Sequence, residues 1–440
     1  MEAEVKKPIE LNNKRTINAW AMFDWANSSY ALVIAVAIFP IYFNGIVADD
    51  FTFLGIKMTD TALFSYSLSF AYLIIALILP ILSGIADYGG RKLSFMTFFT
   101  FLGGLACIAM FWFVKQPGTH ADSNVYFGVT TFILAVIGFA GGQVFYNSYL
   151  PLIVSKDRFD KVSARGFAFG YVGSVILLIA NIIMLQKPEW FGLQDNLFAS
   201  RVSFLMVGIW WIGFAQITFA RMPKEKKAPW SKKLMKRGFE ELGKVWSQVK
   251  TMTNIKRFLT SFFFYSAGVQ TVIYLASTFA TDELKFETGD LIKVILILQL
   301  VAIIGAYLFA YISKLRGNKF SLMSMLFIWI AICFAAYFVQ GQMDFYIIAA
   351  FVGLVMGGVQ SMSRSTYSKL IPEGTQDTAS FFSFFDVLEK VAIVMGTFSF
   401  GLIEQLTGGM RNSILALTIY FLIGIIFLLM VTVEKKKAVA

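Results

Sequence analysis

The chain has 440 residues, of which 57% are hydrophobic and only 15% are charged. A soluble globular domain has about 45–50% apolar and about 25% charged residues, so the composition excludes a soluble protein and indicates one that crosses the membrane many times. The net charge of +11 does not require a nucleic-acid partner, because membrane insertion selects for basic residues in cytoplasmic loops. We expect no nucleic acid among its partners.

Apolar runs long enough to cross the lipid bilayer, about 20 residues each, recur along the chain. They lie near residues 17–44, 61–84, 93–114, 126–150, 164–185, 200–220, 257–281, 289–312, 320–339, 345–369, 381–404 and 412–433. The sequence therefore predicts an all-α integral membrane protein with twelve transmembrane helices.

The longest polar segment separates the sixth run from the seventh. Its lysine-rich amphipathic pattern is typical of a helix that lies along the lipid headgroups, and the alternative is a flexible basic linker. We expect five regions: an N-terminal tail at 1–16, a six-helix half at 17–220, a basic linker at 221–256, a second six-helix half at 257–433 and a tail at 434–440.

The basic residues collect in alternate loops. The loops that share a side with both termini and the linker hold most of the 38 Lys and Arg residues. By the positive-inside rule, this side is cytoplasmic. We expect a multi-pass protein of the bacterial cytoplasmic membrane with both termini in the cytoplasm.

The two halves carry traces of an internal repeat. The loop after the second run reads SGIADYGGRKLSF, and the loop after the eighth reads AYISKLRGNKFSL. Aligning Gly90 with Gly317 also brings Cys107 and Cys333 within one position of each other. Two pseudo-symmetric six-helix halves of this kind are typical of secondary transporters.

In the first of these loops the chain resembles the major facilitator superfamily, whose signature there is G-x-L-A-D-R-x-G-R-[RK]. A serine and a tyrosine stand in place of the first glycine and the first arginine of the signature. The positions that match are Asp87, Gly90, Arg91 and Lys92. In this superfamily the loop helps to hold one access state, so the resemblance implies a conformational role for these four residues.

A closer resemblance covers nearly the whole chain. The segments FDWANSSY, VFYNSYLP, SARGFAFGYVGS, GGVQSMSRSTYSKLIPEG and FFSFFDVLEKVA resemble the vacuole-effluxer group, the bacterial and fungal relatives of the autophagy-related vacuolar amino-acid permeases. This resemblance implies a twelve-helix transporter of the major facilitator fold. It implies amino-acid efflux more loosely, because that activity belongs to the fungal branch.

Polar residues recur at helical spacing on the first, fourth, seventh and tenth runs. Residues at i, i+3, i+4 and i+7 share one face of a helix. One such stripe could serve interhelical hydrogen bonds, but four at a regular interval favour a shared cavity for a small-molecule substrate. The expected lining is Asp24, Asn27, Ser28, Gln143, Tyr146, Asn147, Gln270, Tyr274, Gln360, Arg364 and Tyr367.

Asp24 is the one carboxylate within the first run. Its own helix offers no cation within one turn, and burial of such a group favours the protonated form. Asp24 is therefore a candidate for coupling transport to protons. The alternative is that it reaches the headgroups, since at about 1.5 Å per residue it lies only about 10 Å inside the helix.

Charged residues also cluster in the eleventh run. Asp386, Glu389 and Lys390 share one helix face, and we expect Arg364 of the tenth run to lie at a similar depth and to pair with Asp386. The cluster could be a gate or a substrate anchor, with the guanidinium meeting a substrate carboxylate. It could equally be a static network, tolerable because it is nearly neutral.

The loop after the second run has a mechanical interpretation of its own. The Asp87 carboxylate can meet the positive N-terminus of a neighbouring helix, and Gly90 permits a tight turn. Arg91 and Lys92 can meet lipid headgroups or an acidic partner.

The sequence thus predicts a monomeric secondary transporter of a small polar organic solute, with amino-acid efflux and proton coupling as hypotheses. No phosphate-binding glycine-rich motif indicates use of ATP. The single histidine, His120, and two cysteines in apolar runs favour neither an enzyme nor a metal site, and we expect no cofactor. The main alternative is a non-transporting membrane sensor or scaffold with the same fold.

Overall fold

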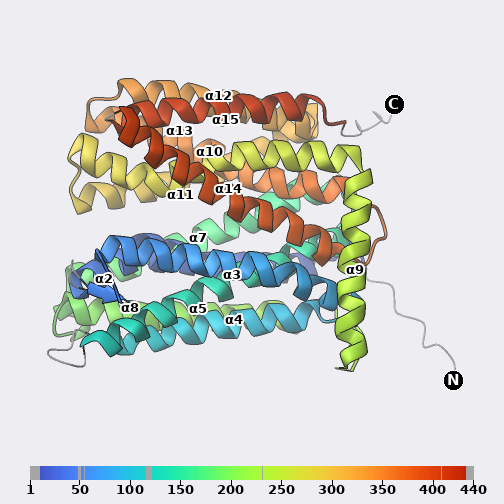
Figure 1. Ribbon diagram of the computed structural model, residues 1–440, viewed down its shortest axis with the longest axis horizontal. Helices are drawn as coiled ribbons and strands as arrows, with labels where there is room; N and C mark the ends of the chain where they lie inside the picture. The colour runs from blue at the N-terminus through green and yellow to red at the C-terminus, as the bar shows by residue number, and fades with distance from the viewer. Residues whose placement is uncertain are drawn as a thin grey trace.

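The structure is a computed structural model that describes residues 10–47, 51–53, 55–114, 121–229, 231–407 and 409–432. Its long helices lie roughly side by side in two groups, one from each half of the chain (Figure 1). His120 and the C-terminal tail expected at 434–440 lie outside the described residues, as does most of the N-terminal tail.

The first group contains the helices that precede residue 222. Its long helices are α1 (Lys14–Ser29), η1 (Tyr30–Ile38), α2 (Phe39–Ile46), α3 (Asp60–Gly89), α4 (Lys92–Ala109), α5 (Ala121–Ser148), α7 (Phe159–Gln186) and α8 (Asn196–Arg221). Its short elements are the antiparallel strands β1 (Phe51–Phe53) and β2 (Ile56–Met58), the turns η2 (Met110–Trp112), η4 (Lys156–Arg158) and η5 (Pro188–Phe191), and α6 (Leu150–Ile153).

The first crossing is continuous from α1 through η1 to α2, but η1 is a π-helix nine residues long. Insertions of π-helix are uncommon and often lie near functional sites. This one begins one turn after the polar face that carries Asp24 and Asn27. Its wider turns change the direction in which later side chains of the same crossing point.

The second group contains α10 (Thr253–Leu284), α11 (Thr288–Arg316), α12 (Asn318–Phe338), α13 (Gln342–Leu370), α14 (Thr378–Thr407) and α15 (Met410–Leu429). Among the described residues, 11 helical segments are long and apolar enough to cross a membrane. Helix α14 is as long but carries a charged cluster, and it packs along α3, α10 and α15. Together they make the predicted bundle of twelve crossings.

The two loops that align in the sequence repeat also share a backbone feature. Gly90 between α3 and α4 has φ +61°, and Gly317 between α11 and α12 has φ +87°. Glycine adopts such angles readily because it has no Cβ. The repeat therefore extends to a glycine with positive φ after the second and the eighth crossing, although ψ differs between them at 44° and 160°.

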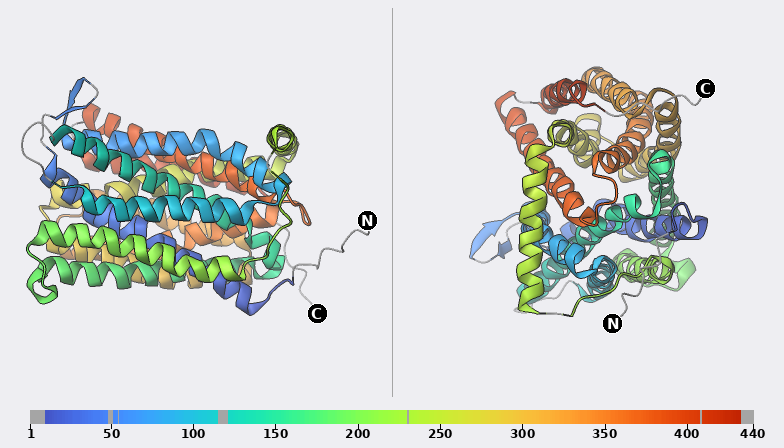
Figure 2. Two further views of the ribbon diagram at one scale, coloured as in Figure 1. Left: turned by 90° about the horizontal axis from the view of Figure 1, so that it is seen from below. Right: turned by 90° about the vertical axis from the view of Figure 1, so that its right-hand side faces the viewer.

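Helix α9 (Lys232–Thr251) lies between the two groups in sequence and crosses the ends of the long helices (Figures 1 and 2). Ser231 caps it by accepting a hydrogen bond from the Leu234 amide. It crosses α3 where two glycines meet, because a Cβ at Gly84 would clash with the Gly238 carbonyl. The alternative of a flexible connector is therefore wrong for this part of the linker.

Candidate functional site

Asp24 of α1 and Arg364 of α13 form an ion pair between the two halves. Arg364 Nη1 lies 3.3 Å from Asp24 Oδ2, and each side chain is only 3% exposed. The Tyr146 hydroxyl of α5 donates to the same carboxylate oxygen at 2.5 Å. A buried charge is tolerated when a partner and hydrogen bonds replace its hydration, and this carboxylate has both.

The first half also holds the rest of the Arg364 guanidinium. Nε donates to Ser163 Oγ at 2.9 Å, and Nη2 donates to the Ser163 carbonyl at 2.8 Å. Nη1 also donates to Asn147 Oδ1 at 3.2 Å. The guanidinium carbon lies 4.2 Å from the ring centroid of Phe167 and 4.8 Å from that of Trp20. The fixed fork of an arginine and its affinity for aromatic faces suit it to this position.

Gly166 of α7 leaves the space that this pair occupies. A Cβ there would lie 2.7 Å from both Asp24 Oδ2 and Tyr146 Oη, and 2.8 Å from Arg364 Nη2. Sequence reasoning missed Gly166 and Ser163. The available signal was the spacing of Gly166 and Gly170 in SARGFAFGYVGS, since small residues four apart let helices approach closely.

The predicted pairing of Arg364 with Asp386 is wrong. Asp386 Oδ1 accepts instead from Lys390 Nζ at 3.1 Å, and the same ammonium lies 3.0 Å from Glu389 Oε2. Because these residues are neighbours on one face of α14, they satisfy one another locally, and Arg364 finds its partner on α1. The alternative that Asp24 reaches the headgroups is also wrong, because it is buried and points at α13.

The charged cluster of α14 lies where the two halves face each other. Gln270 of α10 donates to Glu389 at 3.1 Å, and Lys390 Nζ lies 5.6 Å from the ring centroid of Tyr72 on α3. Glu389 is the most exposed of the three charged side chains, at 24%. Among the described residues, Asp386 Oδ2 is buried without a hydrogen-bond partner.

Two further pairs of polar residues bridge the halves, one beside this cluster and one near the Asp24–Arg364 pair. The hydroxyls of Tyr72 and Tyr274 lie 3.1 Å apart, and Tyr171 of α7 donates to Gln360 of α13 at 2.6 Å. Two predicted lining residues, Tyr274 and Gln360, thus form hydrogen bonds across the interface. Tyr171 was not identified from the sequence.

The remaining predicted lining residues differ in their surroundings. Ser28 packs against Gly170, while Asn27 is fully buried and its amide has no partner among the described residues. Gln143 is half-buried. The placement of Tyr367 in the cavity is wrong, because it is fully buried and donates at 2.8 Å to the Phe381 carbonyl within the second half. That the other residues contact a substrate stays a prediction.

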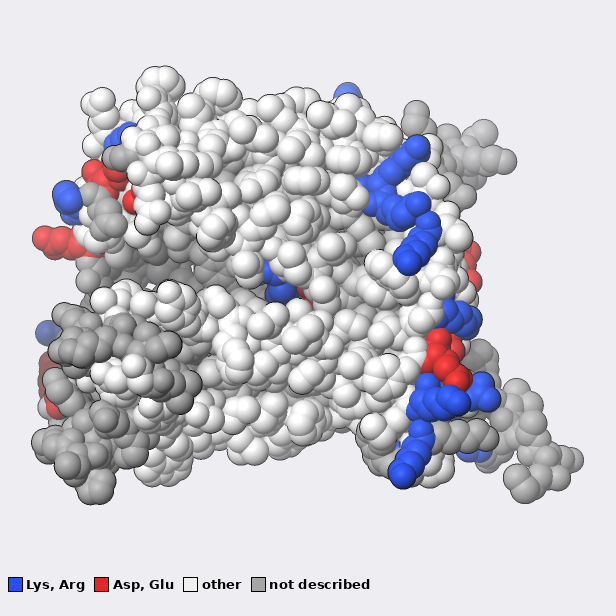
Figure 3. All heavy atoms as spheres, in the orientation of Figure 1, with Lys and Arg blue, Asp and Glu red and all other residues white. Residues whose placement is uncertain are grey.

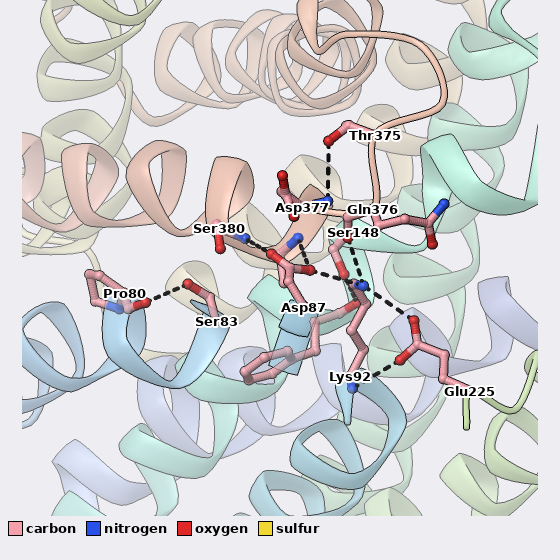
Figure 4. A network of polar contacts seen from close by, with 12 residues as sticks. Pro80, Ser83, Asp87, Lys92, Ser148, Glu225, Thr375, Gln376, Asp377 and Ser380 are labelled. Carbon is pink, nitrogen blue, oxygen red and sulfur yellow. Dashed lines mark hydrogen bonds and ion pairs between the residues drawn. The ribbon is translucent and has the colours of Figure 1, made fainter. Parts of the chain in front are cut away.

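Asp87 closes the bundle at the end where α9 lies, here called the α9 end. Its two carboxylate oxygens accept from the Ala379 amide at 3.1 Å and from the Ser380 amide at 2.7 Å, both in the first turn of α14 (Figure 4). An anion is stabilised at a helix N-terminus by free amides and the helix dipole. The expectation that Asp87 meets a neighbouring helix N-terminus is confirmed.

Lys92 holds Asp87 in place. Its ammonium lies 2.9 Å from Asp87 Oδ1 and 3.2 Å from Glu225 Oε1, and it donates to the Gln376 carbonyl at 3.0 Å (Figure 4). The alternative that it meets lipid headgroups is wrong, because the side chain is only 1% exposed. Arg91 donates to the Ala228 carbonyl at 3.2 Å, so both cations fasten the linker to this loop.

In the other repeat, Asp160 binds the loop between α11 and α12, much as Asp87 joins the loop between α3 and α4 to α14. Asp160 was not identified from the sequence. Located on α7, it accepts from Ser313 at 3.0 Å and from Asn318 at 2.8 Å, which flank the loop between α11 and α12. Lys369 Nζ lies 2.6 Å away. The α9 end is therefore fastened on both sides of the pseudo-symmetry axis.

Asp377, just before α14, adds a titratable group to this end. Burial, together with the nearby charges of Asp87 and Glu241, raises the pKa of the Asp377 carboxyl, and Lys244 at 3.5 Å opposes that shift. A proton held there reduces repulsion between carboxylates at the closed end.

The opposite end differs from the α9 end. The surface is hollowed there between the two halves, while the largest group of basic residues on this face lies at the α9 end (Figure 3). The contacts between the halves therefore close the α9 end, while this face is hollowed between the halves at the other end.

Two six-helix halves that meet through polar contacts and close at one end have the fold of a major facilitator transporter. The Escherichia coli fucose:proton symporter FucP has this fold with a TM-score of 0.69 at 14% identity, covering 96% of this chain and 98% of its own. The proton:xylose symporter XylE gives 0.67 at 13% identity, with 94% of both chains covered.

Sequence comparison identifies the family. The family model described as "Vacuole effluxer Atg22 like" matches residues 12–440, so the chain belongs to this family, as the resemblance predicts. The uncharacterised MFS-type transporter YxiO of Bacillus subtilis is 31% identical, with 96% of each chain covered. Autophagy-related protein 22 of Eremothecium gossypii is 24% identical over 97% of this chain and 92% of its own. The protein is a secondary transporter and not an enzyme.

The Asp24–Arg364 pair predicts coupled effects on stability. Asp24→Asn and Arg364→Gln should each lower the melting temperature of the purified protein, because breaking a buried pair costs roughly 3–5 kcal/mol. The double variant should lose clearly less than the sum of the two. In the matched cycle, Asp386→Asn and Arg364→Gln should be additive. Additive losses for Asp24 and Arg364 would show that the two side chains do not pair.

The Asp87 cap predicts how firmly the α9 end closes. Asp87→Ala should raise the thiol labelling rate of a cysteine at buried Ser148, beside this network (Figure 4), by roughly tenfold, since hydrogen bonds to a charged group contribute about 1.5–3 kcal/mol. The measurement uses a Cys107→Ala/Cys333→Ala background. The control is Asp195→Ala, which removes the cap of α8, where Asp195 accepts from the Phe198 amide at 2.7 Å. Equal labelling in the two variants would contradict the role of Asp87.

Proposed function

We propose that the protein exports amino acids across the cytoplasmic membrane in exchange for protons, by alternating access, with Asp24 as the proton-carrying group. The observation that carries this proposal is the buried Asp24–Arg364 pair, because it joins the two halves through a group that can lose its charge. Asp24 and Arg364 belong to the same chain, which supports a monomer as the functional unit.

The charge on Asp24 sets how strongly the halves attract each other at this depth. Opposite charges attract far more strongly in a protein interior than in water. Protonation of Asp24 removes this attraction and leaves Arg364 as a buried cation without a counter-charge, which is unfavourable. A proton on Asp24 therefore favours a conformation in which the halves separate at the α9 end and Arg364 meets water or a substrate carboxylate.

The α14 cluster supports an amino-acid substrate because it presents both signs of charge side by side. Lys390 can meet a carboxylate, while Glu389 and the free oxygen of Asp386 can accept from an ammonium group. Substrate sites of secondary transporters lie near the membrane midplane between the repeats, and this cluster lies 8 to 12 residues after the start of the 30-residue helix α14. The family description as vacuole effluxers supports transport of a solute across a membrane, and proton coupling occurs in FucP and XylE, which share the fold.

The orientation follows from the charge bias of the sequence. The loops at the α9 end are the basic ones, so this end with both termini faces the cytoplasm. The linker at 221–256 then joins the two six-helix halves on the cytoplasmic side, and the described conformation opens outward. A bacterial relative, YxiO, supports the cytoplasmic membrane as the location.

Cysteine labelling tests this orientation. A cysteine at Ser231, beside α9, should react with a membrane-impermeant maleimide only after the cells are opened. A cysteine at Glu189, which is exposed at the other end, should react in intact cells. The reverse pattern would show that the α9 end is extracellular.

Transport in proteoliposomes tests the exchange with protons. An imposed pH gradient should drive accumulation of labelled amino acid by the wild type, and Asp24→Asn should abolish it, because an amide does not exchange a proton in this range. Asp24→Asn/Arg364→Gln, which leaves no unpaired charge, should fold well and also fail. The control is Asp60→Asn, a buried carboxylate at the start of α3, which should keep gradient-driven uptake. Gradient-driven accumulation by the folded double variant would show that Asp24 does not carry the coupled proton. Absence of any flux in the wild type would favour a non-transporting sensor or scaffold.

Ligand-induced thermal stabilisation tests the substrate class. An amino acid such as leucine should raise the melting temperature more than the amine or the acid that each lack one of its two charged groups. In Lys390→Gln, leucine should stabilise the protein no more than the amine does, because the partner of the carboxylate is lost. In Glu389→Gln, the difference in stabilisation between leucine and the acid should become smaller, because a partner of the ammonium group is lost. Lys293→Gln, at an exposed position on α11, is the control. Stabilisation by sugars but not by amino acids would reject the assignment.

A further inference from the structure

Helix α9 has an apolar stripe that the bundle covers only in part, with Trp246 in contact with Phe384 of α14. One face of the helix is buried against the long helices, and the adjacent face exposes three large side chains. The exposed residues are Met235 at 50%, Phe239 at 50% and Trp246 at 46%. Their spacing places them on one side of the helix. Exposed apolar groups of this size favour contact with apolar material rather than water.

Basic residues border this stripe. They are Lys232, Lys236 and Lys250, whereas Arg237 and Lys244 lie on the opposite side of the helix. Two acidic residues of α9, Glu240 and Glu241, lie beside Arg237 at 3.5 Å and Lys244 at 2.5 Å, so the helix keeps a net positive charge. Lys250 lies 5.0 Å from the ring centroid of Trp246. Tryptophan next to lysine is typical of the boundary between lipid and water.

The position of α9 along α3 sets its depth. It crosses α3 at Gly84, 24 residues after Asp60, where α3 begins. At about 1.5 Å per residue this is about 36 Å, which exceeds the hydrocarbon thickness of about 30 Å. Helix α9 runs across the helix ends along one edge of the bundle (Figure 2). It therefore lies at the level of the headgroups, beside the surrounding lipid.

Helix α9 and the segment before it are also fastened to the closed end. The Ala228 amide donates to the Gly89 carbonyl at 2.9 Å, and Lys244 lies 3.5 Å from Asp377, just before α14. A Cβ at Gly84 would clash with the Gly238 carbonyl, so α9 cannot shift along α3 without repacking. Anything that holds α9 in place also holds the start of α14 against α3.

We propose that α9 binds the anionic phospholipid headgroups of the adjacent leaflet and thereby holds the α9 end closed. Lysine and arginine side chains near an anionic membrane surface are attracted to it, and the apolar stripe adds insertion at the boundary of the acyl chains. The proposal does not depend on the substrate or on proton coupling.

Fluorescence quenching tests lipid binding. The full chain, with Cys107→Ala and Cys333→Ala, carries a fluorophore on Gly243→Cys, a position on α9 with nothing within 4 Å of its Cβ site. It is reconstituted in phosphatidylcholine with or without phosphatidylglycerol, each containing a headgroup spin-labelled lipid. Phosphatidylglycerol should increase quenching several-fold, and high salt should remove the increase.

Charge variants separate α9 from the rest of the surface. Lys232→Gln/Lys236→Gln/Lys250→Gln should lose the increase, whereas Lys187→Gln/Lys285→Gln, exposed residues in loops away from α9, should keep it. Equal quenching in both membranes, or quenching only by an aqueous quencher as expected for a soluble partner's docking face, would overturn the proposal.

Labelling of Ser148→Cys in the same membranes tests the effect on closure. Phosphatidylglycerol should slow labelling several-fold in the wild type and also in Asp24→Asn/Arg364→Gln, which distinguishes this proposal from failure of proton coupling. Lipid-dependent quenching without any change in labelling would overturn the claim that α9 holds this end closed.

Discussion

The structure depends on one electrostatic constraint: a charge within the membrane-spanning bundle needs a partner, and the partner of Arg364 is on the other half of the chain. The guanidinium reaches Asp24 and Ser163 in a space that exists because residue 166 is a glycine. Each half therefore completes the burial of a group from the other. A contact of this kind is strong while both charges are present and weak once one is lost, which is what a switch between two conformations requires.

Two further sets of polar contacts lie along the interface, one on α14 and one at the α9 end. Within α14, Lys390 pairs with two neighbouring carboxylates, so the cluster carries one net negative charge when both carboxylates are ionised. At the α9 end, Asp87 and Asp160 fasten the loops of the two repeats to the facing helices. The Asp24–Arg364 pair joins the same two halves, so under the proposed mechanism a change in its charge would act on both sets of contacts.

The fold followed from the sequence because hydrophobic length and helical spacing are local properties. Spacing also identified Asp24, Tyr146, Asn147 and Arg364, which meet in the structure. Helical spacing did not predict the contacts of a side chain where these depend on how the helices pack against one another. The direction of the Arg364 side chain depends on the space beside Gly166, which is on another helix. Tyr367 is on the same helix as Arg364, but its side chain packs within the second half and donates to the Phe381 carbonyl. Asp160 was missed because its partners come from three other segments of the chain.

Under the proposed mechanism, the charge on Asp24 controls whether the α9 end is closed. Lys156 and Glu373 lie on opposite halves at this end, 3.1 Å apart, with exposed side chains. Spin labels on cysteines at these two positions report the separation of the halves by electron paramagnetic resonance. We expect a short distance at high pH and a growing population of a longer one as the pH falls, with Asp24→Asn at the longer distance at every pH. A distance that does not change with pH, or the same pH dependence in Asp24→Asn as in the wild type, would contradict it.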